Sequence, residues 1–273
     1  MGSASTLSTE RYLAHIGCQK AKPPTAGFLA ELQENHIRSV PYENLDILAG
    51  REVSLKISDV YAKIITQHRG GYCFELNALF AWLLRQLGYE VIDYVARFWR
   101  DEPNLPPKRR HHVLGVKSEG RWYLADVGVG GVIPLQPLPL IADMENIQGG
   151  ECYRLVRDPR FGWVLEERHH ENWRRIYTFT QEPQEPEDFA FANFWCQNAA
   201  ESIFRKGPIL AIRNREGRNS LAGGEVRLFR PQGVEVITPA DDREWHEAVR
   251  KYFGLQLPEN FPWSPRFEKT TVV

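Results

Sequence analysis

The sequence predicts an α+β protein, because helical and strand-like patterns occupy different parts of its 273 residues. Helical spacing fills the first third of the chain, strand-like runs fill the middle, and the last part mixes the two. Two further observations bear on function. A glycine pair precedes the clearest helix at Cys73, and the adjacent histidines His111 and His112 open a strand pair that ends near Asp126. We therefore expect a helical part that carries the cysteine and a strand-rich part that carries a histidine and an aspartate.

In the first third, apolar residues recur at helical spacings behind three suitable N-cap residues: Ser8, Thr25 and Ser58. These caps predict a helix over residues 9–16, a second that runs towards His36, and a third after residue 58. The clearest predicted helix follows Cys73 and ends at Gly88. Its apolar stripe consists of Leu76, Leu79, Phe80, Leu83, Leu84 and Leu87.

The middle of the chain changes to strand-like runs of β-branched and aromatic residues with turn residues between them. The predicted strands are residues 89–99, 111–117, 121–129, 152–156, 162–166 and 174–179, with proline-rich loops at 101–107 and 134–139. A helix over 186–198 and strands over 209–214, 225–230 and 234–237 follow. The last predicted helix begins near Thr238 and Pro239, and its buried stripe is Trp245, Ala248, Val249, Tyr252 and Phe253.

Composition excludes several classes of partner. The formal net charge of −1 gives no long-range field that would favour nucleic acid or an anionic membrane. No apolar stretch approaches the roughly 18 residues of a membrane span, and no secretory signal pattern is visible. The only tight basic run is residues 108–110, which is either a solvated loop or a cation cluster for a phosphate-bearing ligand. Nothing in the sequence predicts the oligomeric state.

The four cysteines lie far apart and form no C-x-x-C pair, which argues against a zinc ribbon or a dithiol redox motif. A reducing, cytoplasmic setting with free thiols is the default expectation. Three of them are read as structural or incidental: Cys18, Cys152 and Cys196. The pair His169-His170 lacks partners at a metal-ligand spacing, so no metal site is expected and a surface strand end is the simpler interpretation.

Cys73 is the candidate nucleophile. It follows Gly70 and Gly71, which allow a tight turn and close approach of a ligand to the backbone. A thiol at a helix N-terminus feels the positive end of the helix dipole, which favours the thiolate. The alternative is a small buried residue, as most free cysteines are. A nucleophile also needs a base, and the base needs a group that orients it.

The hairpin over residues 111–129 can supply both groups. A three-residue loop at 118–120, with Gly120 in the left-handed conformation, would place His112 opposite Asp126. Directly opposed residues lie about 5 Å apart at Cβ, which suits a carboxylate that holds an imidazole. In this register His111 points to the opposite face. A two-residue loop would shift the pairing by one residue and separate His112 from Asp126.

In the predicted site, Asp126 binds one nitrogen of His112 and the other nitrogen takes the proton of Cys73. The resting state would then be a thiolate–imidazolium pair. The alternative interpretation of the His–Asp pair alone is an ordinary structural hydrogen bond.

Residues 69–77, Arg-Gly-Gly-Tyr-Cys-Phe-Glu-Leu-Asn, resemble the active-site motif of the arylamine N-acetyltransferases. The Pro-Tyr-Glu-Asn-Leu turn at 41–45 is similar to the same family. So is the order of Cys73, His112 and the Ala-Asp-Val-Gly-Val-Gly-Gly run at 125–131. The resemblance covers most of the chain and thins after about residue 200.

The resemblance implies a cysteine-peptidase-like core made of a helical bundle (1–88), a β-barrel (89–198) and an α/β lid (199–273). It implies ping-pong transfer, in which Cys73 is acetylated by acetyl-CoA and an arylamine or arylhydrazine then attacks the thioester. Acetyl-CoA is thus a substrate, and no tightly bound cofactor is expected. The expected CoA contacts are Gly128, Gly130 and His111, and the expected acceptor pocket is Val129, Phe204 and Tyr42. Turn geometry explains the glycines equally well.

The sequence departs from the family pattern at a few positions. Val129 stands where the family usually has Phe, which implies a wider or differently shaped acceptor pocket, and His111 stands where Thr is common. After residues 193–195, Cys-Gln-Asn-Ala replaces a Ser-Thr-His-Pro run, whereas Ser202 and Phe204 fit. These changes leave an amide synthase on a natural-product thioester, or a Cys–His–Asp hydrolase, as alternatives; a binding protein with an inactive triad is a third.

Other residues carry open interpretations. Glu43 and Arg69 either form an ion pair that braces the cysteine loop or lie exposed to solvent. Glu75 and Asn77, in the first turn of the Cys73 helix, are expected to be structural. Four aromatic residues are most simply core, with a substrate cleft as the alternative: Phe191, Phe194, Trp195 and Phe204.

Overall fold

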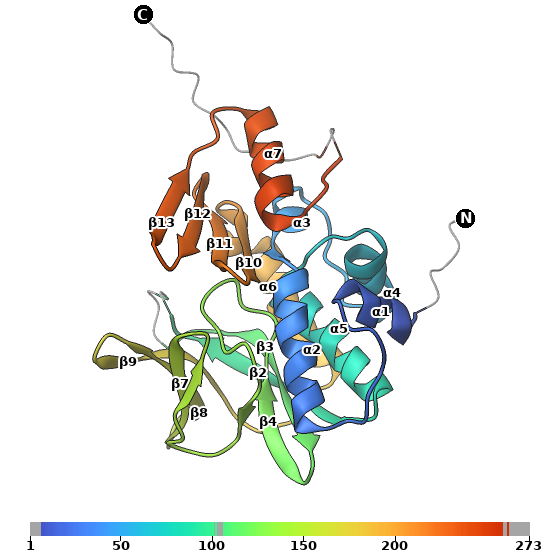
Figure 1. The fold of residues 1–273 in the computed structure, drawn as a ribbon, viewed down its shortest axis with the longest axis vertical. Coiled ribbons are helices and arrows are strands. Elements are labelled where there is room, and N and C mark those ends of the chain that lie inside the picture. Colours follow the sequence, from blue (N-terminus) through green and yellow to red (C-terminus); the bar gives the residue numbers. More distant parts are fainter. Residues whose placement is uncertain (1–6, 101, 103–105, 259–260, 262–273) are drawn as a thin grey trace, which may run out of the picture.

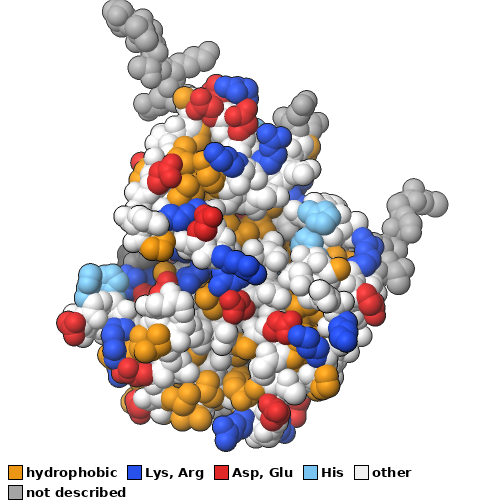
Figure 2. Space-filling model, viewed as in Figure 1, with side chains coloured by type: hydrophobic (Ala, Val, Ile, Leu, Met, Phe, Trp, Pro, Cys, Tyr) orange, Lys and Arg blue, Asp and Glu red, His pale blue; other side chains and the backbone are white. Residues whose placement is uncertain are grey.

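The computed structural model describes residues 7–100, 102, 106–258 and 261 (Figure 1). Most of the predicted proline-rich loop at 101–107 therefore lies outside the described residues. Among those that are described, no helix is both long and apolar enough to cross a lipid bilayer. On the face in Figure 2, positive and negative side chains are interspersed.

The first part of the chain is helical, as predicted. Its helices are α1 (Thr9–His15), α2 (Ala26–Ser39), α3 (Leu45–Leu48), α4 (Ile57–Tyr61), a π-helical turn (Ala62–Thr66) and α5 (Cys73–Gln86). The side chains of Ser8 and Thr25 accept hydrogen bonds from the first turns of α1 and α2, so both predicted caps are confirmed. The third helix begins at Ile57 with Lys56 at its N-cap, so the prediction that Ser58 opens it is wrong.

An eight-stranded antiparallel sheet follows and curves into a barrel-like body, green to olive in Figure 1. Its strands are β2 (Glu90–Phe98), β3 (Arg109–Ser118), β4 (Arg121–Ala125), β5 (Leu138–Pro139), β6 (Asn146–Gln148), β7 (Glu151–Asp158), β8 (Gly162–His169) and β9 (Asn172–Phe179). The spatial order is β5-β4-β3-β2-β9-β8-β7-β6. The predicted strand over 121–129 ends at Ala125, so Asp126 and the glycines after it form a loop.

A second, five-stranded sheet has the order β1-β10-β11-β12-β13. Its strands are β1 (Tyr42–Glu43), β10 (Ile209–Asn214), β11 (Gly217–Ala222), β12 (Glu225–Arg230) and β13 (Gly233–Ile237). The edge strand β1 comes from the helical first part of the chain, so this sheet links the two ends of the sequence. Strand β11 was not predicted, because its Gly-Arg-Asn-Ser start has poor strand propensity and only pairing with β10 and β12 makes it extended.

Helix α7 (Asp242–Phe253) covers the second sheet, and α6 (Phe189–Asn198) follows a 3₁₀ turn (Pro186–Asp188). The stripe of α7 is buried as predicted at Trp245, Ala248, Val249 and Phe253. Its N-cap is Asp241, whose side chain accepts from Glu244 N, so the predicted start near Thr238 is wrong. On α6, Phe191 and Phe194 are 87% and 68% exposed, so these two aromatic residues do not belong to the core.

A histidine is sealed inside the helical part. His36 on α2 is fully buried, its Nδ1 lies 2.8 Å from the hydroxyl of Tyr12, and its Nε2 has no partner among the described residues. Burial, with a smaller contribution from His15, lowers the pKa of His36 from its ordinary 6.5 to about 3.

Acid should therefore destabilise the protein between about pH 6.5 and pH 3, because over this range the unfolded chain binds a proton at His36 and the folded chain does not. From about pH 8 to about pH 5, His36 alone should lower the free energy of unfolding by about 2 kcal/mol. Urea midpoints of the wild type and His36→Gln at both pH values test this. The variant should lose less stability on acidification, and equal losses would show that other groups carry the effect.

Candidate active site

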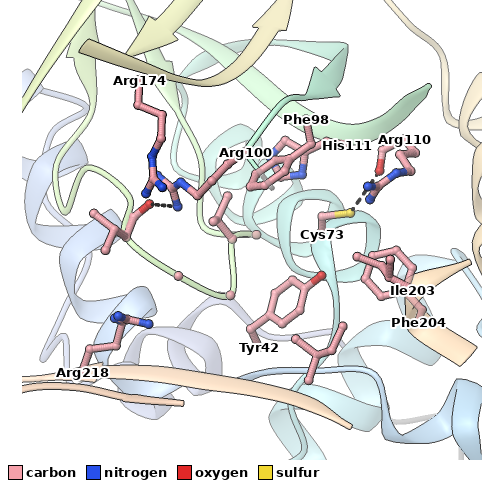
Figure 3. Close-up of a pocket in the computed structure, with 16 residues that line it drawn as sticks. Tyr42, Cys73, Phe98, Arg100, Arg110, His111, Arg174, Ile203, Phe204 and Arg218 are labelled. Atoms are coloured by element: carbon pink, nitrogen blue, oxygen red, sulfur yellow. Dashed lines mark hydrogen bonds between the residues drawn. The ribbon is translucent and has the colours of Figure 1, made fainter. Parts of the chain in front are cut away.

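Cys73 is the first residue of α5 and is buried. The preceding Gly70 packs against backbone, since a Cβ there would lie 2.1 Å from Pro41 O. The backbone that approaches Gly70 closely is thus the chain's own Pro41 turn and not, as predicted, a ligand. Cys73 reaches the wall of a pocket of about 330 Å³ that opens between the two sheets (Figure 3).

Buried ion pairs hold this cysteine loop. Both Nε and Nη2 of Arg69 donate to Glu43 Oε1, at 3.1 and 2.7 Å, so of the two open interpretations the structure has the ion pair. Lys63 binds Asp46 and Glu75, each at 2.8 Å. Burial alone would lower the pKa of Lys63, but the carboxylates of Glu75, Glu43 and Asp46 raise it above its ordinary value. Glu75 also accepts from Tyr72 N at 3.1 Å, which fixes the start of α5.

The β3–β4 hairpin has a different register from the predicted one. Ser118 pairs with Arg121, so the loop is the two residues Glu119 and Gly120. Both have positive φ, 50° and 76°, as a type I′ turn requires. In this conformation the carboxylate of Glu119 accepts a hydrogen bond from Ala26 N at 3.0 Å, which attaches the turn to the start of α2. The predicted three-residue loop is therefore wrong.

This register exchanges the roles of the two histidines. His111 Nε2 lies 2.7 Å from Asp126 Oδ2, so the predicted pairing of Asp126 with His112 is wrong. His112 points to the other face of β3, where its Nε2 lies 2.8 Å from Asp93 Oδ1. Successive side chains of a strand alternate between its faces, so the shift of one residue moves His111 to the side of Asp126 and removes His112 from it.

Asp126 is buried and held from several sides. Its Oδ1 accepts hydrogen bonds from Asn77 Nδ2 at 2.8 Å and from Gly128 N at 2.7 Å, which leaves Oδ2 for His111. Asn77 also donates to His112 O at 2.7 Å and accepts from Val127 N at 3.0 Å. The expected structural role of Asn77 is thus an orienting role: its amide fixes the loop that carries the aspartate.

The environment of the thiol favours its protonated form. Burial raises the pKa of Cys73 well above its ordinary value, and the neighbouring Cys196 and Asp126 add to this. The backbone N–H of His112 and the charge of Arg110 act in the opposite direction. The Cys73 thiol donates a weak hydrogen bond to Arg110 O, with a sulfur–oxygen distance of 3.7 Å. The helix start is therefore not enough to give a thiolate, and a base must remove the proton.

The pocket around Cys73 gathers every residue predicted for CoA or acceptor contact: Gly128, Gly130, His111, Val129, Phe204 and Tyr42. His112 lines a different cavity. The glycines are required by close packing: a Cβ on Gly128 would lie 2.8 Å from Cys73 Cα, and one on Gly130 would lie 2.7 Å from the Tyr42 ring. Neither of these glycines has positive φ, so close packing explains them and turn geometry does not.

Four arginines also line this pocket, and no carboxylate does so among the described residues: Arg100, Arg110, Arg174 and Arg218. Arg100 and Arg174 share Glu167, and Arg110 pairs with Glu102 at 2.7 Å. Burial and the neighbouring Arg213 lower the pKa of Arg218. The basic run at 108–110 therefore contributes one pocket cation, whereas Lys108 lies over the Trp195 ring.

Sequence inspection missed several residues of the site. Gln33 on α2 accepts from Asp126 N at 3.2 Å. Burial, followed by the charge of Asp126 and a hydrogen bond with it, raises the pKa of Tyr177. Neither residue lies in a recognisable motif, and each reaches Asp126 from a distant segment. Arg110 carried a signal, since it belongs to the only tight basic run.

Comparisons with known proteins agree with this geometry. The N-acetyltransferase family model matches residues 26–261. The chain is 33% identical over 246 residues to "Arylamine N-acetyltransferase / N-hydroxyarylamine O-acetyltransferase" of Salmonella typhimurium. The matched region covers 89% of this chain and 87% of that protein.

Solved structures give the same result. The arylamine N-acetyltransferase of Salmonella typhimurium superposes with a TM-score of 0.88 at 31% identity, covering 92% of each chain. The Mycobacterium marinum arylamine N-acetyltransferase in complex with CoA gives 0.85 at 31% identity, covering 91% of this chain and 93% of that one. Fold and sequence together define an acyltransferase. More narrowly, the chain belongs to the arylamine N-acetyltransferase family.

Proposed function

We propose that this enzyme moves an acetyl group from acetyl-CoA to an arylamine or arylhydrazine through a thioester on Cys73. The observation that carries the proposal is the His111–Asp126 pair, because His111 lines the same pocket as the only cysteine in that lining. The catalytic set is thus Cys73, His111 and Asp126, with His111 as the base in place of His112.

In the first half-reaction, Asp126 accepts the Nε2–H of His111, so the Nδ1 lone pair is free to take the proton of Cys73. The sulfur attacks the acetyl carbonyl of acetyl-CoA and forms a new carbon–sulfur bond. The bond to the CoA sulfur breaks, and CoA leaves with the proton that His111 returns. Because burial raises the pKa of the Cys73 thiol, this transfer is what generates the nucleophile.

In the second half-reaction, the amine nitrogen attacks the Cys73 thioester. His111 takes the proton that the nitrogen loses and delivers it to the departing sulfur, which restores the thiol. The products are the N-acetylated amine and the free enzyme, so atoms and charge balance across the cycle.

The pocket suits both substrates. Arginines at its wall complement the phosphates of CoA, because guanidinium groups form short charge-assisted hydrogen bonds with phosphate. Tyr42, Phe98 and Phe204 give aromatic and apolar surface for the ring of the acceptor. The four free cysteines suit a reducing cytoplasm.

Steady-state kinetics test the transfer. Initial rates of CoA release, measured while acetyl-CoA and an arylamine are varied together, should give parallel double-reciprocal lines, as expected for a ping-pong cycle. Release should depend on the amine. Equal release without an amine would identify a hydrolase, and intersecting lines would contradict the acetyl-enzyme.

A further inference from the structure

A second cavity of about 480 Å³ lies on the other face of β3 and shares no lining residue with the active-site pocket. One face of α5 forms a wall through Phe74, Ala78 and Trp82. Strand β2, the segment 183–186 and Phe189 close the other sides. This volume falls within the range of sites that enclose small molecules, and its walls are mainly aromatic and aliphatic, as in such sites.

A buried polar pair forms one end of this cavity. His112 is 2% exposed, its ring packs on Phe189 with 4.2 Å between centroids, and its Nε2 lies 2.8 Å from Asp93 Oδ1. The other oxygen of Asp93 pairs with Arg85. Burial alone would raise the pKa of Asp93, but hydrogen bonds and charge from His112 and Arg85 lower it, so the carboxylate is ionised.

The ionised Asp93 fixes the tautomer of His112. An ionised carboxylate can only accept, so His112 donates from Nε2, and in the neutral imidazole Nδ1 carries the lone pair. No described residue donates to Nδ1. His112 Nδ1 is therefore an available hydrogen-bond acceptor beside the aromatic wall, whereas both oxygens of the neighbouring Asp93 carboxylate are already engaged. The other polar lining residues are Arg85, Gln86, Gln184 and Glu185.

We propose that this cavity is a second ligand site, which takes a small, uncharged aromatic molecule with an O–H or N–H donor directed at His112 Nδ1. Phe74, Trp82 and Phe189 supply faces and edges for the ring. A donor is selected because a ring without one leaves Nδ1 buried and unpaired. A charged molecule is disfavoured, since burial of an unpaired ion costs more than the apolar contacts return.

The test uses 4-fluorophenol as the probe and ¹⁹F NMR as the readout, with 4-fluoroanisole as the matched ring that lacks the donor. 4-Fluorophenol should bind the wild type with a Kd of about 1 mM or tighter, as expected for a ligand of eight heavy atoms with a high binding free energy per atom. The anisole should bind about fivefold more weakly, the value of one neutral hydrogen bond. In His112→Phe the difference between the two probes should vanish.

A pair of filling variants locates the site. Ala78→Leu fills the second cavity and should weaken phenol binding at least about tenfold, whereas Val129→Phe fills the active-site pocket and should leave it unchanged. Melting temperatures verify that both variants fold. If Ala78→Leu does not fold, the comparison of the two probes on His112→Phe tests the proposal in its place. The proposal is overturned if the wild type does not bind phenol, if Val129→Phe alone abolishes binding, or if both probes bind equally.

Discussion

Replacing His111 by alanine should lower kcat/KM for acetyl transfer by about 10³-fold or more, whereas His112→Ala should stay within about tenfold of the wild type. His111 is the imidazole that Asp126 holds at 2.7 Å in the wall of the pocket that contains Cys73. Without it, a thiol whose pKa is raised by burial keeps its proton. The side chain of His112 lies on the other face of β3 and faces Asp93.

The two alanine variants form a matched pair, because the residues are adjacent, both buried, and both bound to an aspartate. Melting temperatures separate lost chemistry from lost folding. Loss of activity in His112→Ala with activity retained in His111→Ala would overturn the assignment and, with it, the importance of the observed hairpin register.

Asp126→Asn should lower kcat by about 10³- to 10⁴-fold while the protein keeps its fold. Oδ1 of Asp126 accepts from Asn77 and from Gly128 N, so the carbonyl of an asparagine must take that position. Its NH₂ group then faces His111 Nε2, which is forced to accept. The His111 proton moves to Nδ1, and the imidazole can no longer take the proton of Cys73.

Asp93→Asn is the control, since it alters the partner of His112 in the same chemical way. We expect it to change kcat only a few-fold. The two variants are compared by kcat at saturating acetyl-CoA and arylamine, with folding verified by circular dichroism. Activity in Asp126→Asn near that of Asp93→Asn would show that Asp126 does not set the tautomer of the base.

Local chemistry explains which elements were predictable. The caps Ser8 and Thr25 and the helix after Cys73 depend on residues within one or two turns, so the sequence was enough to predict them. The hairpin was also predicted, but its tip was not. The positive φ of Glu119 occurs together with a hydrogen bond from Ala26 N to its carboxylate. The resulting loop is one residue shorter than predicted, and this difference determines which histidine meets Asp126.

The surroundings of the site were beyond sequence reasoning for the same reason. Gln33, Asn77 and Tyr177 reach Asp126 from α2, α5 and β9, three elements that only the tertiary fold brings together. The pairing of Glu43 with Arg69 was foreseen as one of two options, and the structure decides for the ion pair through burial and geometry.

The mass of the intact protein after brief exposure to acetyl-CoA, without an acceptor, tests the central claim most directly. The wild type should gain one acetyl group, Cys73→Ala should gain none, and an arylamine should remove the adduct from the wild type. His111→Ala should acylate far more slowly than His112→Ala. Transfer through Cys73 would be contradicted if Cys73→Ala were acetylated to the same extent as the wild type. It would also be contradicted if the wild type acetylated the arylamine without ever carrying the adduct.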